Sequence, residues 1–335
     1  MNKLESASFQ AINNCLQVKN GERVVIITDK QRKNISEMMF SEAKKKTSDV
    51  KMFVMEDFGE RSDDGNNSLV FPKEIGDEMK NCDVSIYCAG SKKGELVSFR
   101  TPMLKIVENS KTLRHAHMPG VNDEIMETGM LTDYVEIKNL CKRVYDSVCD
   151  AKQIRVTTEL GTDFTVNLGY KWIICDGDIS KTGVWTNLPD GEVFTCQKNL
   201  NGRIVVDGVL GDYLDKKYGS IEKTPLTLEV KNGEIVNVEC ENKSIVDDIN
   251  IEMKKDEFAN RIGEFAIGTN IGLKELIGNM LQDEKFPGVH VAIGHGYPEM
   301  TGVEWNSSTH VDCVIRNTTI YVDGKKIMDK SKFLI

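Results

Sequence analysis

The chain has 335 residues, of which 40% are apolar and 28% charged, a balance that excludes a mainly disordered protein. Its net charge of −9 would repel a phosphate backbone, so we expect no nucleic-acid partner. No apolar run is long enough to cross a bilayer and the first residues lack a signal-peptide core, so we expect no membrane partner. Nine scattered cysteines without a C-x-x-C pair suit free thiols, and we predict a cytoplasmic location.

The first half alternates helical and strand patterns. Strand-like runs are expected at 22–28, 51–55, 84–88 and 113–117. Helical spacing is expected at 4–18, 34–47, 71–81, 95–110 with a break at Pro102, and 137–152. This alternation predicts parallel β/α crossover units, and therefore a Rossmann-like β/α domain over residues 1–150. Neither G-x-G-x-x-G nor a P-loop follows the first strand, so nothing in the sequence supports nucleotide binding.

Strands dominate from residue 151 onward. The segments 154–158 and 163–166 flank a turn and predict a hairpin. Further strands are expected at 202–209, 226–230, 235–238 and 319–322, with a helix at 247–261. The fold class is therefore α/β, with the β/α domain followed by a strand-rich α+β domain over residues 151–335.

Two histidines, His115 and His117, alternate at the end of an expected strand and would share one of its faces. No carboxylate or cysteine lies beside them in the sequence. A polar strand end or an interdomain contact is therefore a better interpretation than a metal site.

Three segments near the C-terminus place ionisable side chains on one face of a strand. These are His310 with Asp312, His290 with Ala292, and Glu264 with Ala266. Imidazole and carboxylate groups are common metal ligands, and ionisable groups on apolar strands are costly unless they are paired or bind metal. The three strands could converge on one cation, with exposed polar faces as the alternative.

Other residues rank below these on pattern alone. Glu192, in the segment 187–195, supplies a further candidate carboxylate. Tyr297 lies seven residues after His290 and could reach the site as a hydrogen-bond donor. His295 stands between two glycines and is expected to be a loop residue rather than a ligand.

An ordered set of motifs carries a resemblance to a known family. The motifs are Leu188-Pro189-Asp190-Gly191-Glu192-Val193-Phe194-Thr195, Gly263-Glu264-Phe265-Ala266-Ile267-Gly268-Thr269-Asn270, His290 with Ala292-Ile293-Gly294, Tyr297-Pro298, and Ser308-Thr309-His310-Val311-Asp312. Together they resemble the catalytic domain of the thermophilic metallo-aminopeptidases, the group of aminopeptidase T. The first half, including Gly21-Glu22-Arg23-Val24-Val25-Ile26, resembles the N-terminal domain of that family.

The resemblance implies a pair of divalent metal ions, such as Zn, Co or Mn. Their ligands would be Glu192, Glu264, His290, His310 and Asp312, and Tyr297 would lie at the metal centre. One position departs from the family, because Gly191 stands where the peptidases usually carry a second glutamate.

We therefore predict a metallo-aminopeptidase that removes N-terminal residues from small peptides through a metal-activated water. Glu264 or Asp312 could bridge the two cations, and Glu192 would act as a ligand or as the general base. Tyr297 could stabilise the oxyanion. We expect a homo-oligomer, a dimer.

The main alternative is a ring-cleaving oxygenase. Gly191 and the shorter chain are shared with a sister group similar to 2,5-dihydroxypyridine 5,6-dioxygenase, which binds one iron through two histidines and an aspartate. His290, His310 and Asp312 could form such a triad on Fe(II). Glu264 counts against this, because a further ligand would block an open position. A non-catalytic protein that retains the fold is a third interpretation, and it is disfavoured because the whole ligand set is present.

Overall fold

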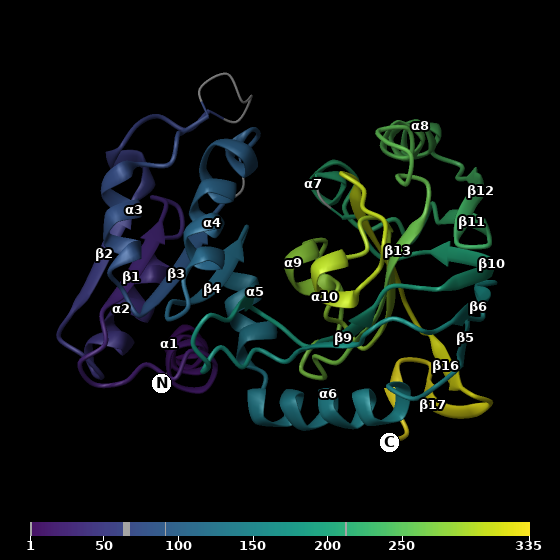
Figure 1. The fold of residues 1–335 in the computed structure, drawn as a ribbon, viewed down its shortest axis with the longest axis horizontal. Coiled ribbons are helices and arrows are strands. Elements are labelled where there is room, and N and C mark those ends of the chain that lie inside the picture. Colours follow the sequence, from purple (N-terminus) through teal and green to yellow (C-terminus); the bar gives the residue numbers. More distant parts are fainter. Residues whose placement is uncertain (1, 63–67, 91, 212) are drawn as a thin grey trace. The chain divides into compact units, whose positions relative to one another are not determined.

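The computed structural model describes residues 2–62, 68–90, 92–211 and 213–335, which divide into two compact units. The first unit contains the chain up to Val135 together with Gly177–Asp190 (Figure 1). The second unit contains Glu136–Asp176 and Gly191–Ile335. These units differ from the expected ranges 1–150 and 151–335, because the segment 177–190 supplies a strand to the first unit.

The first unit is built on a parallel five-stranded sheet in the order β2-β1-β3-β4-β8. Its strands are β1 (Val24–Thr28), β2 (Val50–Val54), β3 (Val84–Ala89), β4 (Arg114–Pro119) and β8 (Trp185–Asn187). Every residue of β1 and β3 is buried, as continuous apolar runs predict for strands covered on both faces. The Rossmann-like prediction is confirmed, while the short edge strand β8 was not expected.

Helices flank this sheet. They are α1 (Lys3–Phe9), α2 (Lys33–Lys44), α3 (Lys73–Lys80), α4 (Thr101–Asn109) and α5 (Asp123–Glu127), and α1 runs on into a π-helical segment, Gln10–Cys15. Residues of α3 and α4 form a core cluster with Val25, Ile27 and Tyr87 of the sheet. The helical stretch predicted to break at Pro102 changes type there, because a π-helical segment, Leu96–Arg100, runs directly into α4 and Pro102 stands in the first turn of α4.

An arginine lies at the carboxyl ends of β1 and β3, the place where doubly wound sheets commonly bind ligands. The Arg61 side chain is only 1% exposed. Its Nη1 lies 3.1 Å from Asp29 Oδ2, and its Nε and Nη2 donate to Glu95 over 2.7 and 2.6 Å. The chain's own guanidinium thus lies at this position and is held there by Asp29 and Glu95.

The second unit contains two antiparallel sheets. The order of the larger sheet is β12-β11-β10-β6-β5-β16-β17-β18, and that of the smaller is β15-β14-β13-β9-β7. The larger sheet is formed by β5 (Gln153–Thr157), β6 (Asp163–Asn167), β10 (Asn199–Val206), β11 (Leu226–Lys231), β12 (Glu234–Glu239), β16 (Thr319–Val322), β17 (Lys325–Asp329) and β18 (Lys332–Phe333). The predicted hairpin is confirmed as β5–β6.

The smaller sheet carries the predicted site residues. Its strands are β7 (Ile173–Cys175), β9 (Glu192–Thr195), β13 (Ile262–Gly268), β14 (Gly288–Gly294) and β15 (His310–Ile315). The further α-helices in the described part of the chain are α6 (Tyr134–Val148), α7 (Leu214–Tyr218), α8 (Lys243–Glu252), α9 (Met280–Asp283) and α10 (Pro298–Thr301), and short 3-10 helices lie at Met55–Asp57 and Gly129–Leu131. The helix expected at 247–261 thus starts and ends earlier, and Asn242 caps it by accepting the Ser244 N–H.

The two faces of the smaller sheet have different surroundings. On one face, the Phe265 ring packs edge-on against Phe164 of β6 at 6.2 Å and against Trp172 at 6.1 Å. Because side chains alternate along a strand, Glu264 points to the opposite face. That opposite face carries the ionisable residues.

Candidate metal centre

Small side chains in the middle of the smaller sheet make room for larger polar ones. Ala266 of β13 pairs with His290 of β14, and Ala292 pairs with both Glu264 and Asp312. All these residues share one face of the sheet, because paired positions point the same way. The longer side chains can therefore meet above the two alanines, although they come from three strands.

The first donor group consists of Glu192, Glu264 and His290, from β9, β13 and β14. His290 Nε2 lies 3.5 Å from Glu192 Oε2 and 3.6 Å from Glu264 Oε1. All three residues are buried. Glu192, which ranked low on sequence pattern, is thus brought to the other candidates.

The second donor group consists of Glu264, His310 and Asp312. His310 Nε2 lies 3.7 Å from Glu264 Oε2 and 3.3 Å from Asp312 Oδ1. Glu264 therefore belongs to both groups and presents a different oxygen to each histidine. The His310 side chain is 29% exposed against 2% for His290, so the cluster opens to solvent beside His310.

The donor atoms are spaced as the ligands of a divalent cation would be. A tetrahedral ion with ligand bonds of about 2.1 Å separates its ligand atoms by about 3.4 Å. The four nitrogen–oxygen distances of the two groups run from 3.3 to 3.7 Å, longer than ordinary hydrogen bonds. The buried Glu192 Oε2 has no hydrogen-bond partner. Carboxylate and imidazole donors with an unsatisfied buried oxygen fit a divalent metal.

The electrostatics of the cluster favour positive charge. Burial alone would lower the pKa of both histidines. Contact with Glu264 and the charges of Glu192, Glu264 and Asp312 outweigh burial and raise the pKa of His290 to about 9. Asp312 and Glu264 likewise raise the pKa of His310 to about 10. A site that attracts protons this strongly will attract metal cations for the same reason.

Tyr297 lies beside the second donor group, as the sequence predicted. Its hydroxyl is 3.2 Å from His310 Nε2. Burial and the surrounding carboxylates, first among them Glu264, raise its pKa well above the usual value, so the phenol keeps its proton. The Tyr297 backbone has φ 54°, a left-handed conformation that a residue with a side chain rarely adopts and that often marks functional positions.

A scan against family models matches residues 131–335 to the thermophilic metalloprotease (M29) family. The chain belongs to this family. Membership confirms the predicted resemblance and makes the chain a metal-dependent hydrolase. A search of curated proteins found no match.

Two solved structures share the fold of this M29 protein. AmpT from Thermus thermophilus aligns with a TM-score of 0.72 and 17% identity over 99% of both chains. The 2,5-dihydroxypyridine dioxygenase from Pseudomonas putida KT2440 aligns with a TM-score of 0.71 and 16% identity, over 98% of this chain and 96% of its own. At such low identity these likenesses establish the fold alone.

Sequence reasoning missed two residues of the cluster, Glu284 and Lys285. Glu284 forms a third donor group with His290 and Asp312. Lys285 Nζ lies 2.6 Å from Glu192 Oε1 and 2.8 Å from Glu284 Oε1. Both residues directly follow the short helix α9, where the run Asp-Glu-Lys looks like ordinary surface charge.

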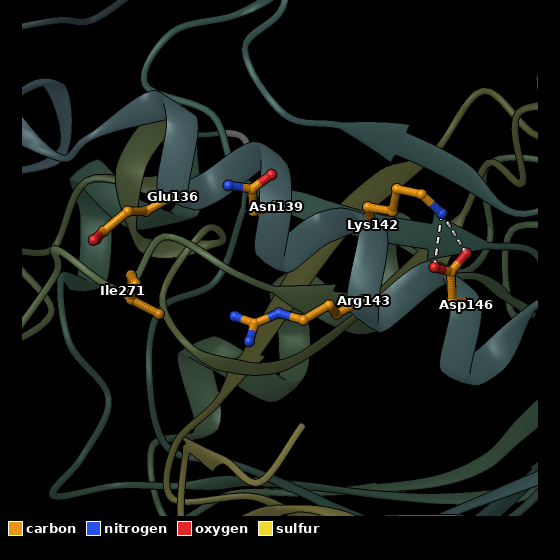
Figure 2. A pocket seen from close by; sticks show the side chains of 6 residues that line it. All are labelled: Glu136, Asn139, Lys142, Arg143, Asp146 and Ile271. Atoms are coloured by element: carbon orange, nitrogen blue, oxygen red, sulfur yellow. Dashed lines mark hydrogen bonds and ion pairs between the residues drawn. The ribbon is translucent and has the colours of Figure 1, made fainter.

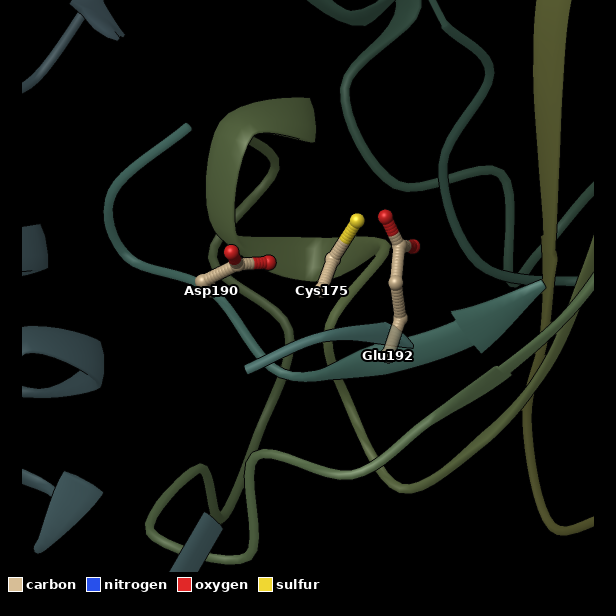
Figure 3. Close-up of side chains that lie close together, drawn as sticks. All are labelled: Cys175, Asp190 and Glu192. Carbon is tan, nitrogen blue, oxygen red and sulfur yellow. The ribbon is translucent and has the colours of Figure 1, made fainter. Parts of the chain in front are cut away.

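Cys175, like the other eight cysteines, carries a reduced thiol, as the sequence suggested. Cys175 of β7 and Glu192 of β9 are paired residues and are drawn in Figure 3. Asp190, also drawn there, belongs to the other unit, where it accepts hydrogen bonds from the Gly177 N–H and the Thr186 hydroxyl. Its carboxylate thus has structural partners.

An open pocket of about 590 Å³ lies along α6. Figure 2 shows its lining residues: Glu136, Asn139, Lys142, Arg143, Asp146 and Ile271. Lys142 and Asp146 form an exposed ion pair at 2.7 Å, and no lining residue belongs to a donor group.

Among the described residues, no helix is both long and apolar enough to span a bilayer.

Proposed function

We propose that this M29 protein is an aminopeptidase that hydrolyses the N-terminal peptide bond of small peptides and uses two divalent cations. The observation that carries the proposal is the shared carboxylate: Glu264 presents Oε1 to His290 and Oε2 to His310, at 3.6 and 3.7 Å. One carboxylate between two donor groups is the arrangement that a two-metal site needs. When bound, such cations lower the pKa of water and polarise a carbonyl.

The charge of the cluster suits a substrate with a free α-amine. Four carboxyl groups converge here, from Glu192, Glu264, Glu284 and Asp312, and burial raises the pKa of Glu284 to about 8, so that the other three carry most of the negative charge. An acidic site attracts the ammonium of a peptide N-terminus and disfavours a blocked one. This preference would make the enzyme an exopeptidase.

Two side chains have the positions required for chemistry. The Tyr297 hydroxyl keeps its proton and lies at the open side of the cluster, beside His310, where it can donate a hydrogen bond to a developing oxyanion. Glu192 has one oxygen held by Lys285 and one without a partner, so it can serve as a ligand or as the general base.

The test is anaerobic hydrolysis. The metal-free protein would be reconstituted with Zn²⁺, Mn²⁺ or Co²⁺ and incubated with a short peptide and with the same peptide N-acetylated. We expect release of the first residue from the free peptide only. Cleavage of both peptides would indicate an endopeptidase, and cleavage of neither would overturn the proposal.

The oxygenase alternative predicts a different grouping of ligands. A two-histidine, one-carboxylate iron site needs both histidines on one ion. Among the described residues, His290 and His310 fall in different donor groups, with the Glu264 carboxylate between them. If the protein hydrolyses neither peptide but oxidises a dihydroxylated pyridine ring in the presence of Fe(II) and oxygen, the oxygenase interpretation replaces the peptidase proposal.

A further inference from the structure

Lys285 places a fixed positive charge inside the acidic cluster. Its side chain is only 3% exposed. The ammonium lies 2.6 Å from Glu192 Oε1 and 2.8 Å from Glu284 Oε1. Both partners are members of donor groups that contain His290. A lysine ammonium here competes directly with any metal ion for those two carboxylates.

The backbone holds Lys285 firmly in this place. Its N–H donates to Gln282 O, and its carbonyl accepts the Asn270 N–H, both over 2.9 Å. The end of β13 approaches this segment so closely that a Cβ on Gly268 would lie 2.1 Å from Phe286 O. Only glycine permits this approach, which brings the segment after α9 over the polar face of the sheet. The ammonium is therefore part of the built site and not a mobile surface group.

The charge acts unequally on the two donor groups. The group around His290 includes Glu192, one of whose oxygens Lys285 already holds. In the group of Glu264, His310 and Asp312, the described ion pairs instead join His310 Nε2 to the two carboxylates, at 3.7 and 3.3 Å. Because electrostatic repulsion decreases with distance, the Lys285 ammonium should repel a metal ion bound by Glu192 and His290 more than one bound by His310 and Asp312.

We infer that Lys285 makes the two cation subsites unequal, so that the ion at His310 and Asp312 binds tightly while the ion at His290 binds weakly and exchanges. This inference rests on the two-cation site proposed above. Lys285 acts through Glu192 and Glu284 and is thus a positioning residue. It supplies part of the positive charge that a second metal would otherwise provide.

Metal titration of the metal-free protein tests the inference without measuring turnover. Calorimetry with Mn²⁺ should resolve two steps in the wild type, the second at least tenfold weaker than the first. Lys285→Met removes the charge and keeps the apolar stem, and it should tighten the second step at least tenfold with little change in the first. Lys285→Arg keeps the charge and should retain the weak second step.

Lys217→Met is the matched control, because Lys217 pairs with Asp248 at 2.6 Å and belongs to no donor group. It should leave both steps as in the wild type. Equal affinities in the wild type, or a second step that Lys285→Met weakens, would overturn the inference. Equal affinities in the wild type would overturn the inference whether or not Lys285→Met folds. If the wild type binds no metal ion at all, the proposed function fails instead.

Discussion

Each unit of the protein contains a pair of histidines, all of them buried except the partly exposed His310, and the two pairs have opposite electrostatic surroundings. His115 and His117 lie on β4, with ring centroids 5.5 Å apart, and burial lowers the pKa of His115 to about 3. His290 and His310 lie on β14 and β15, where carboxylates raise the pKa of each to about 9 and 10. The same residue type is thus held neutral in one unit and favoured as a cation in the other.

The neighbours account for this difference. His115 Nδ1 contacts the Ser85 hydroxyl at 2.7 Å, and its Nε2 lies 3.3 Å from His117 Nδ1. The His117 ring stacks on Tyr87 at 5.1 Å. A hydroxyl and an aromatic ring satisfy neutral imidazoles but cannot balance a metal ion. Because both rings are buried, an exposed polar strand end is excluded, while the alternative of an interdomain contact and the preference against a metal site stay predictions.

Removing one histidine from each pair is expected to give the largest difference between the two units. His310→Ala should lose the metal ion of its own donor group and the peptidase activity, because it removes the one nitrogen donor of that group. His117→Phe keeps a ring on Tyr87 and should leave the metal content unchanged. Elemental analysis of both purified variants provides the measurement. Full metal occupancy in His310→Ala would refute the proposed site.

Glu264→Gln tests the shared carboxylate. It keeps the size of the side chain but removes the charge that faces both histidines. We expect the loss of one metal equivalent and at least a hundredfold decrease in kcat. Glu252→Gln is the control, since Glu252 is buried in the same unit but belongs to no donor group. Two equivalents in Glu264→Gln would show that Glu264 does not bridge the ions.

The first histidine pair should also make the protein sensitive to acid. The folded pKa of His115 lies below its unfolded value near 6.5, so the unfolded state binds the proton more readily. The stability that His115 contributes is therefore complete above about pH 6.5 and is lost as the pH falls toward 3. At pH 5 the loss from one such group is about 2 kcal/mol.

His117→Phe isolates this effect. Burial and the adjacent His115 hold the pKa of His117 well below its usual value, so the variant removes one of the two acid-sensitive groups. Chemical denaturation of the metal-loaded wild type and variant at pH 7.5 and pH 5 gives the measurement. The wild type should lose more stability on acidification than the variant. Identical losses would mean that the pair is not held neutral.

Strand alternation singled out four of the five predicted ligands, because it fixes which residues share a face, whereas the full set with Glu192 came from the family resemblance. His310 and Asp312 are two residues apart on β15, and Glu264 and His290 each follow the same rule beside an alanine. Which of these residues pair across neighbouring strands, and therefore meet above the two alanines, is set by the strand register, which only the structure gives. Glu192 ranked low because its strand has only four residues and follows a turn.

Glu284 and Lys285 could not be placed from sequence. They follow a four-residue helix, and their arrival at the site depends on the close approach at Gly268. Likewise, β8 has only three residues and pairs with β4 from more than 60 residues away in the chain, so no local pattern indicates it. Contacts of this kind are set by tertiary packing, which local propensity does not encode.

Gly191→Ala should displace the carboxylate of Glu192, which lies beside His290, without removing it. Gly191 has φ 131°, and a Cβ there would lie 3.0 Å from Asn270 N, so strain and crowding both act beside Glu192. We expect a loss of about 1–3 kcal/mol in stability and weaker metal binding. Gly324→Ala, at φ 85° with open space around it, should cost less and leave metal binding intact. Thermal melts and metal titration of both variants give the comparison.

The smallest effect is expected at the histidine that belongs to neither pair. The His295 ring packs edge-on against Tyr297 at 4.8 Å and lies 6.2 Å from the ring of His310. Its Nδ1 contacts Asn306 Oδ1 at 2.5 Å, and it appears in none of the donor groups found among the described residues. His295→Ala should therefore leave the metal content unchanged and lower kcat only a few-fold, through looser packing of Tyr297. A metal equivalent lost on this substitution would show that proximity to His310, and not membership of a carboxylate-bearing donor group, determines which histidines bind metal.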